Sequence, residues 1–187
     1  RALLWQGHPV EADKMLAQFE PAQMDERQLM LWGLARVSIL FWSMGDVDRA
    51  HYHLALLRER IEHPSLKLVV EAIGSMMAVH ENKIDEGIAA ALAVLDDVSA
   101  PKQAVDFAAF SAGLAMPVAG RGLDFEPYAK RCRAEQKATD GMIRVMVRYC
   151  DVLALLYTGQ FESAVQRAAD YAESPQPNSF SGGPLRR

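Results

Sequence analysis

Gly45-Asp46-Val47-Asp48-Arg49-Ala50 is the stretch of sequence that decides the fold, because its pattern returns four more times at nearly constant spacing. The pattern consists of a glycine, an apolar residue two positions later and an alanine three positions after that. The other copies start at Gly7, Asn82, Gly120 and Gly159, so successive copies lie 38, 37, 38 and 39 residues apart. A repeat of this length without a strand pattern is typical of stacked helical hairpins, in which each pair of helices buries its apolar face against its neighbours.

The repeat predicts an all-α fold, a superhelical array of antiparallel helix pairs with a repeat of about 37–39 residues. We expect nine to ten helices in a repeat domain covering residues 1–173, with turns near residues 7, 45, 82, 120 and 159. Residues 174–187 are rich in Pro, Ser and Gly without periodicity, which indicates a flexible linker or tail. Strand pairing by Leu66 to Val70, the most strand-like run, would contradict the repeat interpretation.

Individual residues predict further local features of the helices. Asp25, with Gln28 three positions later, fits a capping box for a long helix from about Glu26 to Met44. Asn82 can adopt the left-handed conformation that glycine supplies at the other turns. Pro117 should kink the first helix of the fourth repeat or end it early, because proline removes a backbone hydrogen bond.

The composition excludes several classes of partner. Lys and Arg number 20 against 24 Asp and Glu, and the net charge of −4 argues against direct binding of nucleic acid. The longest apolar stretch, residues 29–45, contains Arg36 and is shorter than the roughly 20 residues of a membrane-spanning helix, so no membrane partner is expected. Cys132 and Cys150 form no Cys-x-x-Cys motif and no secretory signal is recognisable, which favours a cytoplasmic location.

The sequence contains no catalytic or metal-binding constellation. His51 and His53 are two residues apart and do not share a helix face, so we expect solvated side chains and no metal site there. His80-Glu81 begins like a zinc-protease helix, but Ile84 occupies the position of the second histidine. Nucleophile-elbow and phosphate-loop motifs are missing as well. We therefore expect neither an enzyme nor a cofactor.

The repeated turn resembles the hairpin of tetratricopeptide repeats. That family places a small residue seven positions before the turn residue. Ser38, Ser75 and Gly113 occupy the equivalent positions here, whereas the fifth repeat has Val152. The present repeat departs from the family in being longer than the usual length of about 34 residues.

In its longer repeat the chain is similar to the helical region of large ATP-binding LuxR-type transcriptional regulators of the maltose-regulon-activator type. Leu4 to Ala12 and Leu156 to Ala164 carry this likeness, which covers about residues 1–173. It implies a segment that senses a small-molecule inducer, or docks a peptide or protein, beside neighbouring domains of a longer chain. The chain lacks a starting Met and its first turn comes at Gly7, so we expect a fragment. The alternative is a stand-alone scaffold that binds a peptide or protein partner.

The likeness to tetratricopeptide repeats also implies a binding groove, lined by the residues 13, 10, 6, 3 and 2 positions before each turn. The groove would be apolar and aromatic, which suits an amphipathic helix, a lipid-like molecule or a sugar stacked on aromatic rings, with His80 and Tyr157 as polar handles. The candidate site residues are Trp32, Ile39, Trp42, Met76, His80, Phe107, Phe110, Tyr149 and Tyr157. The competing interpretation is that this stripe is core. The solvent would then meet the polar positions Lys67, Glu71, Arg144, Arg148 and Asp151 instead.

Overall fold

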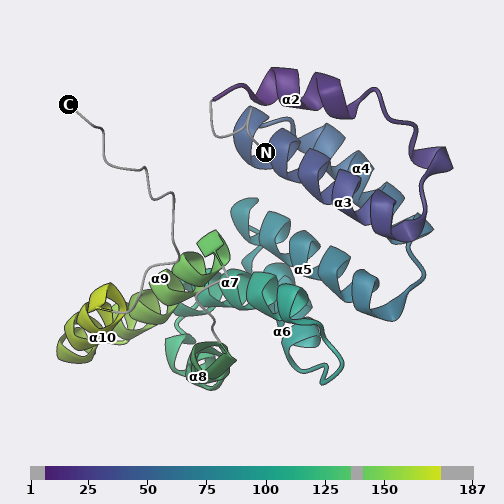
Figure 1. The fold of residues 1–187 in the computed structure, drawn as a ribbon. Helices are drawn as coiled ribbons and strands as arrows, with labels where there is room; N and C mark the ends of the chain where they lie inside the picture. Colours follow the sequence, from purple (N-terminus) through teal and green to yellow (C-terminus); the bar gives the residue numbers. More distant parts are fainter. Residues whose placement is uncertain (1–6, 136–140, 174–187) are drawn as a thin grey trace. The chain divides into compact units, whose positions relative to one another are not determined.

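The computed structural model describes residues 7–135 and 141–173, and the statements below concern those residues (Figure 1). Within them lie nine α-helices and no strand, so the predicted all-α class is confirmed. Leu66 to Val70 belongs to helix α5 (Pro64–His80) and pairs with no strand. None of the helices in the described part of the chain combines the length and apolarity that crossing a membrane requires. The chain divides into two compact units, Arg1–Val70 and Glu71–Arg187, which we describe separately.

The N-terminal unit consists of three helices, two short helical segments and the start of α5. Its elements are α2 (Pro9–Leu16), the 3-10 segment η1 (Pro21–Gln23), α3 (Glu26–Ser38), the π-helical segment η2 (Ile39–Met44) and α4 (Val47–Arg60). Helix α3 packs against α4, and α2 contacts η2. The predicted capping box is confirmed at α3, because the Gln28 backbone N–H donates to Asp25 Oδ1 at 2.8 Å and the Asp25 N–H donates to Gln28 Oε1 at 3.2 Å.

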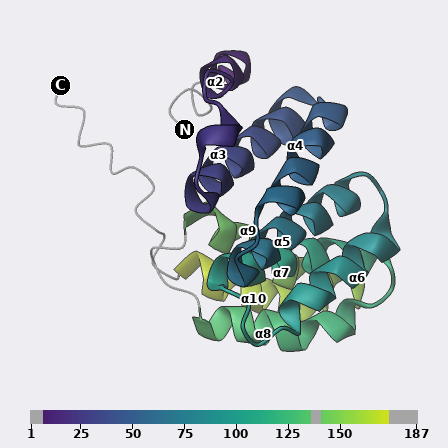
Figure 2. The same cartoon turned by 90° about the vertical axis from the view of Figure 1, so that its right-hand side faces the viewer.

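The C-terminal unit contains the rest of α5 and the remaining helices (Figure 1, Figure 2). These are α6 (Ile84–Leu95), α7 (Lys102–Val118), the 3-10 segment η3 (Gly122–Phe125), α8 (Glu126–Glu135), α9 (Gly141–Tyr157) and α10 (Phe161–Glu173). Helix α7 packs against α6 and α9, and α9 also packs against α8 and α10. The Ser75 hydroxyl donates to Ser111 Oγ at 2.9 Å and joins α5 to α7.

The five turns carry the backbone conformation that the repeat predicts. Left-handed φ angles occur at Gly7 (77°), Gly45 (67°), Asn82 (63°), Gly120 (75°) and Gly159 (74°). Residues with a side chain disfavour this region, which is why four of the five positions are glycine and the fifth is asparagine. The local sequence therefore determines the backbone conformation at each of the five turns.

Hydrogen bonds of the Schellman type close the later turns. The backbone N–H after the turn residue donates to the carbonyl five positions earlier, as in Lys83 to Ala78 at 2.9 Å and Gln160 to Leu155 at 2.9 Å. At Gly45 the bond instead runs from Asp46 to Leu40 at 2.8 Å and spans one residue more. The wider bond follows from the π-helical geometry of η2, in which each turn takes up an additional residue.

The fifth residue after each turn is buried in every repeat. These residues are Ala12, Ala50, Gly87, Phe125 and Ala164. In the fourth repeat the large Phe125 is accommodated by Gly113, because a Cβ atom on Gly113 would lie only 2.7 Å from Phe125 Cζ and 2.4 Å from Cys150 Cβ. The departure at Phe125 is thus a local exchange of a small residue for a large one, with the glycine opposite making room.

One of the two alternatives predicted for Pro117 is wrong, and other predictions lie outside the described residues. Helix α7 continues through Pro117 to Val118, so the early end is not observed, although proline has no N–H to donate to the carbonyl four residues earlier. The alternative of a kink at Pro117 stays a prediction. The expected packing of Leu3, Leu4 and Trp5, the cap at Asp140 and the tail 174–187 all fall outside the described residues.

Candidate binding site

The nine predicted site residues fall in both units and differ widely in exposure. Trp32, Ile39, Met76 and Phe110 are buried, and Phe107 is half-buried. The exposed members are Trp42, His80, Tyr149 and Tyr157. The stripe is therefore neither uniformly core nor uniformly an open groove, and each unit has to be considered for itself.

The polar positions of the competing interpretation are also divided. Lys67 is exposed as expected, but Asp151 on α9 is only 2 % exposed. Its Oδ2 accepts hydrogen bonds from Arg133 of α8 at 2.7 Å and from Arg167 of α10 at 2.6 Å, and also from the Tyr171 hydroxyl. Cations from two flanking helices compensate the burial of this carboxylate, so the expectation of a solvated Asp151 is wrong.

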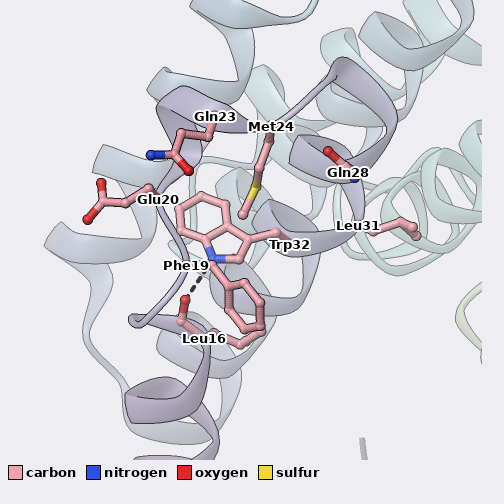
Figure 3. A pocket seen from close by; sticks show the side chains of 8 residues that line it. All are labelled: Leu16, Phe19, Glu20, Gln23, Met24, Gln28, Leu31 and Trp32. Atoms are coloured by element: carbon pink, nitrogen blue, oxygen red, sulfur yellow. Dashed lines mark hydrogen bonds between the residues drawn. The ribbon is translucent and has the colours of Figure 1, made fainter.

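The N-terminal unit contains an open pocket of about 500 Å³. It lies between the last turn of α2, the connection through η1 and the first half of α3 (Figure 3). The lining residues are Leu16, Phe19, Glu20, Gln23, Met24, Gln28, Leu31 and Trp32. Trp32 is the one predicted site residue among them. The pocket brings it together with side chains that the groove prediction did not include.

Trp32 ties the two helical walls of this pocket together. Its indole N–H donates to the Leu16 carbonyl at 2.9 Å, which satisfies one of the carbonyls left open at the end of α2 (Figure 3). The edge of the ring also meets the His53 imidazole of α4, with 5.2 Å between the ring centroids. Trp32 is 5 % exposed, so only a small part of the indole contributes to the pocket surface.

The pocket is apolar with a polar rim. Leu31 is 65 % exposed and Phe19 is 56 % exposed, which is unusual for large apolar side chains on one small surface. The rim carries the carboxylate of Glu20 and two glutamine amides. Gln28 uses its amide oxygen in the capping box of α3, and its amide nitrogen takes no part in that box. The lining contains no cationic side chain, so it disfavours an anionic ligand.

A buried ionic cluster lies next to Trp32 and joins three helices. Asp13 of α2 accepts from Arg36 of α3 at 2.9 Å and from Arg49 of α4 at 2.8 Å. Arg49 also pairs with Asp46 at 3.2 Å, and the Arg36 guanidinium carbon lies 5.3 Å from the centroid of the Trp32 ring. Burial raises the pKa of Asp13, but the hydrogen bonds from Arg49 and Arg36 outweigh this effect and leave the pKa lowered.

His53 belongs to this buried region, contrary to the expectation of a solvated side chain. It is 7 % exposed, and its neighbours on the buried face of α4 are Ala50, Leu54 and Leu57. Burial, assisted by the positive charges of Arg36 and Arg49, lowers the pKa of His53 to about 4, although Asp13 acts in the opposite direction. The spacing 50, 53, 54, 57 is that of one helix face, so the sequence did contain the signal for burial.

Acidification should therefore destabilise the protein through His53. The pKa is about 4 in the folded chain and about 6.5 in the unfolded chain, so the unfolded state binds more protons between these values. Protonation of His53 therefore leaves the free energy of unfolding unaffected above pH 6.5. Between pH 6.5 and pH 4 it lowers the free energy of unfolding by up to about 3 kcal/mol. Urea unfolding of the wild type and His53→Gln from pH 7.5 to 4.5 measures the difference. His51→Gln is the matched control and should keep the wild-type pH dependence; an unchanged slope in His53→Gln would contradict the assignment.

The C-terminal unit offers a smaller pocket and an exposed aromatic surface. The pocket, of about 270 Å³, is lined by residues of η3, α8, α9, α10 and the turn between the last two, among them Glu126, Thr158 and Arg167. Separately, Tyr149 (58 % exposed) and Tyr157 (59 % exposed) project from α9. His80 forms a contact of 2.7 Å between its Nδ1 and the Met76 carbonyl within α5.

The described residues include no group of three or more His, Cys, Asp or Glu side chains that could hold a metal ion. Both cysteines, Cys132 and Cys150, are free thiols and are buried. The Cys150 thiol points to the Phe110 carbonyl at 3.6 Å, and burial raises its pKa, so it stays protonated and a poor nucleophile.

No protein-family model matches the chain, and no curated protein or solved structure matches it either. The resemblance expected from the repeated turns therefore stays a prediction, and the function has to be argued from the geometry of the pocket and of the exposed surfaces.

Proposed function

We propose that the chain is a helical-repeat binding module whose N-terminal unit holds a small, apolar, uncharged or weakly basic ligand. The observation that carries this proposal is the open pocket beside Trp32, which exposes large apolar side chains on the surface of a small unit. Its volume of about 500 Å³ lies within the range of roughly 300–1,000 Å³ that is common for small-molecule sites.

The lining supports this class of ligand. An aromatic ring or a branched aliphatic group would cover Phe19 and Leu31, whose contact with water is unfavourable. Glu20, Gln23 and Gln28 on the rim can accept hydrogen bonds from an amine or hydroxyl group, and the carboxylate of Glu20 opposes a negatively charged ligand.

Binding at this place can be coupled to the arrangement of helices. The pocket lies between α2 and α3, and the same two helices are joined by the Trp32 to Leu16 hydrogen bond and the Asp13 to Arg36 ion pair. A ligand that fits one spacing of these helices better than another would shift their equilibrium. This property supports the proposal of a sensing segment in a larger LuxR-type regulator, with the helix pairs forming a superhelix of the tetratricopeptide type.

A fluorescence titration with N-phenyl-1-naphthylamine, a neutral aromatic probe, tests the pocket. We expect saturable binding that weakens at least tenfold in Leu31→Glu, because the substitution places a charge in the apolar lining of the pocket. The matched control is Met15→Glu, which adds the same charge at a 57 % exposed position of α2 outside the lining. Equal weakening in both variants, or unchanged binding in Leu31→Glu, would contradict the proposed site.

Docking of a partner protein is a second candidate function, because one further surface favours it. Tyr149, Leu156 and Tyr157 of α9 are all exposed, and aromatic side chains of this kind are enriched at protein interfaces. A fluorescence-anisotropy titration of a helical peptide against Tyr149→Ala tests this surface, since loss of binding in this variant would assign docking to α9.

A further inference from the structure

Helix α10 presents an exposed apolar stripe beside the face that packs on its unit. We define the α10 outer stripe as Phe161, Val165, Ala168 and Ala172, which are spaced i, i+4, i+7 and i+11 and therefore share one helix face. Phe161 is 64 % exposed and Val165 is 70 % exposed. A stripe of this kind on a surface helix normally packs against another element.

The adjoining face of α10 is firmly attached to the unit. Ala164 is 2 % exposed, and Arg167 and Tyr171 both donate hydrogen bonds to Asp151 of α9. Burial and the hydrogen bond to Asp151 raise the pKa of Tyr171 to about 12, so the phenol keeps its proton at neutral pH. The exposed outer stripe thus belongs to a helix that α9 holds in place through the adjoining face.

The internal repeat shows what covers the equivalent stripe elsewhere in the unit. Val165, Ala168 and Ala172 stand 6, 9 and 13 residues after their turn, where α6 has Ile88, Ala91 and Leu95. Those three residues of α6 are 3 %, 0 % and 2 % exposed. Helix α6 is followed by α7, which packs against it. We attribute the low exposure of the α6 residues, compared with the stripe residues of α10, to the packing of α7 on α6.

The N-terminal unit supports the same assignment independently. The residue six positions after the turn at Gly7 is Asp13, which bonds to Arg36 of α3 and Arg49 of α4. This position therefore contacts the next helix pair at Asp13, and its equivalent Ile88 in α6 is buried as well.

We propose that the α10 outer stripe is a docking site for a partner α-helix whose chemistry resembles that of α7. Helix α7 carries Ala104, Ala108, Ala112 and Ala115 at zero exposure, and these alanines recur with helical spacing. Small side chains allow two helices to approach closely, while Phe161 and Val165 supply the bulky groups that fill the space between them. The acidic residues Glu162 and Glu173 on α10 further favour a partner helix with flanking lysines.

The experiment uses the full chain and a fluorescein-labelled peptide with the sequence of residues 102–118 and two added lysines at each end. Fluorescence anisotropy should show saturable binding that a scrambled peptide with the same lysines does not reproduce. Val165→Glu should weaken the binding at least tenfold, and Ala172→Glu serves as a second variant of the stripe. Gln166→Glu adds the same charge on the exposed polar side of α10 and should change the affinity by less than about twofold. Circular dichroism verifies that each variant stays helical.

Three results would overturn the proposal. One is binding of the wild type that is no stronger for this peptide than for the scrambled peptide, or that is not weakened in either stripe variant. A second is a tenfold loss in Tyr149→Ala without loss in the stripe variants, which would assign docking to the exposed surface of α9. The third is concentration-dependent dimerisation of the chain that Val165→Glu abolishes, since the stripe would then be covered by a second copy.

Discussion

Replacing Phe125 with alanine should lower the free energy of unfolding by about 3–5 kcal/mol. Phe125 is completely buried at the end of η3, where its ring contacts the α7 backbone at Gly113. The alanine would leave a cavity that the surrounding helices α7 and α9 cannot fill without moving. Urea unfolding followed by circular dichroism measures the loss. Leu123→Ala is the control in the same 3-10 segment, and at 67 % exposure it should have an effect of less than about 0.5 kcal/mol.

The complementarity between Phe125 and Gly113 can be separated from the burial of Phe125 alone. Gly113→Ala in the wild type should cost about 1–3 kcal/mol, because the new methyl group collides with Phe125 Cζ and Cys150 Cβ. In the Phe125→Ala background only the collision with Cys150 Cβ remains, so the cost of the methyl group should fall by at least about 1 kcal/mol. Additive effects of the two substitutions would show that Phe125 does not occupy the space beside Gly113.

This pair illustrates which parts of the fold the sequence can predict. The left-handed turns follow from residues within each turn, because only glycine and asparagine adopt that conformation readily. The exchange of a small residue for Phe125 was visible in the sequence as an irregularity. Its explanation needed Gly113 and Cys150, which lie on two other helices that come together only in the folded unit.

The candidate site was less predictable, because helical periodicity identifies a face but not what covers it. Phe110 and Tyr149 both stand ten residues before their turns, yet Phe110 is 7 % exposed and Tyr149 is 58 % exposed. The pocket beside Trp32 was missed for a related reason. Its walls depend on the path of the chain through η1, and the one available signal was Phe19 and Leu31, two large apolar residues on either side of Pro21.

Buried charges were the other features that the sequence did not predict. Asp13 and Asp151 are both nearly inaccessible, and each is compensated by two arginines from other helices. Periodicity assigns a carboxylate to the solvent unless its partners are known, and these partners lie 16 to 36 residues away in the sequence. The two clusters join α2 to α3 and α4 in one unit and α8 to α9 and α10 in the other.

The Asp13→Ala substitution should be as damaging as the loss of Phe125, lowering the free energy of unfolding by about 3–5 kcal/mol at pH 7. Arg36, which is 8 % exposed, would remain in the interior without its carboxylate. Urea unfolding measures this loss, with Asp124→Ala as the control, since the exposed Asp124 to Arg121 pair should contribute no more than about 1 kcal/mol.

Acid should reduce the difference between Asp13→Ala and the wild type. The pKa of Asp13 is lowered in the folded chain, so its contribution is complete above the unfolded value near 3.9 and is lost as the pH falls through the folded value. Replacing Asp13 with leucine and Arg36 with methionine together should restore part of the stability, because the double variant leaves no unpaired charge from this pair in the interior. Equal stability of Asp13→Leu and of that double variant would contradict the role of Arg36, and would indicate that the exposed Arg49 alone accounts for the loss.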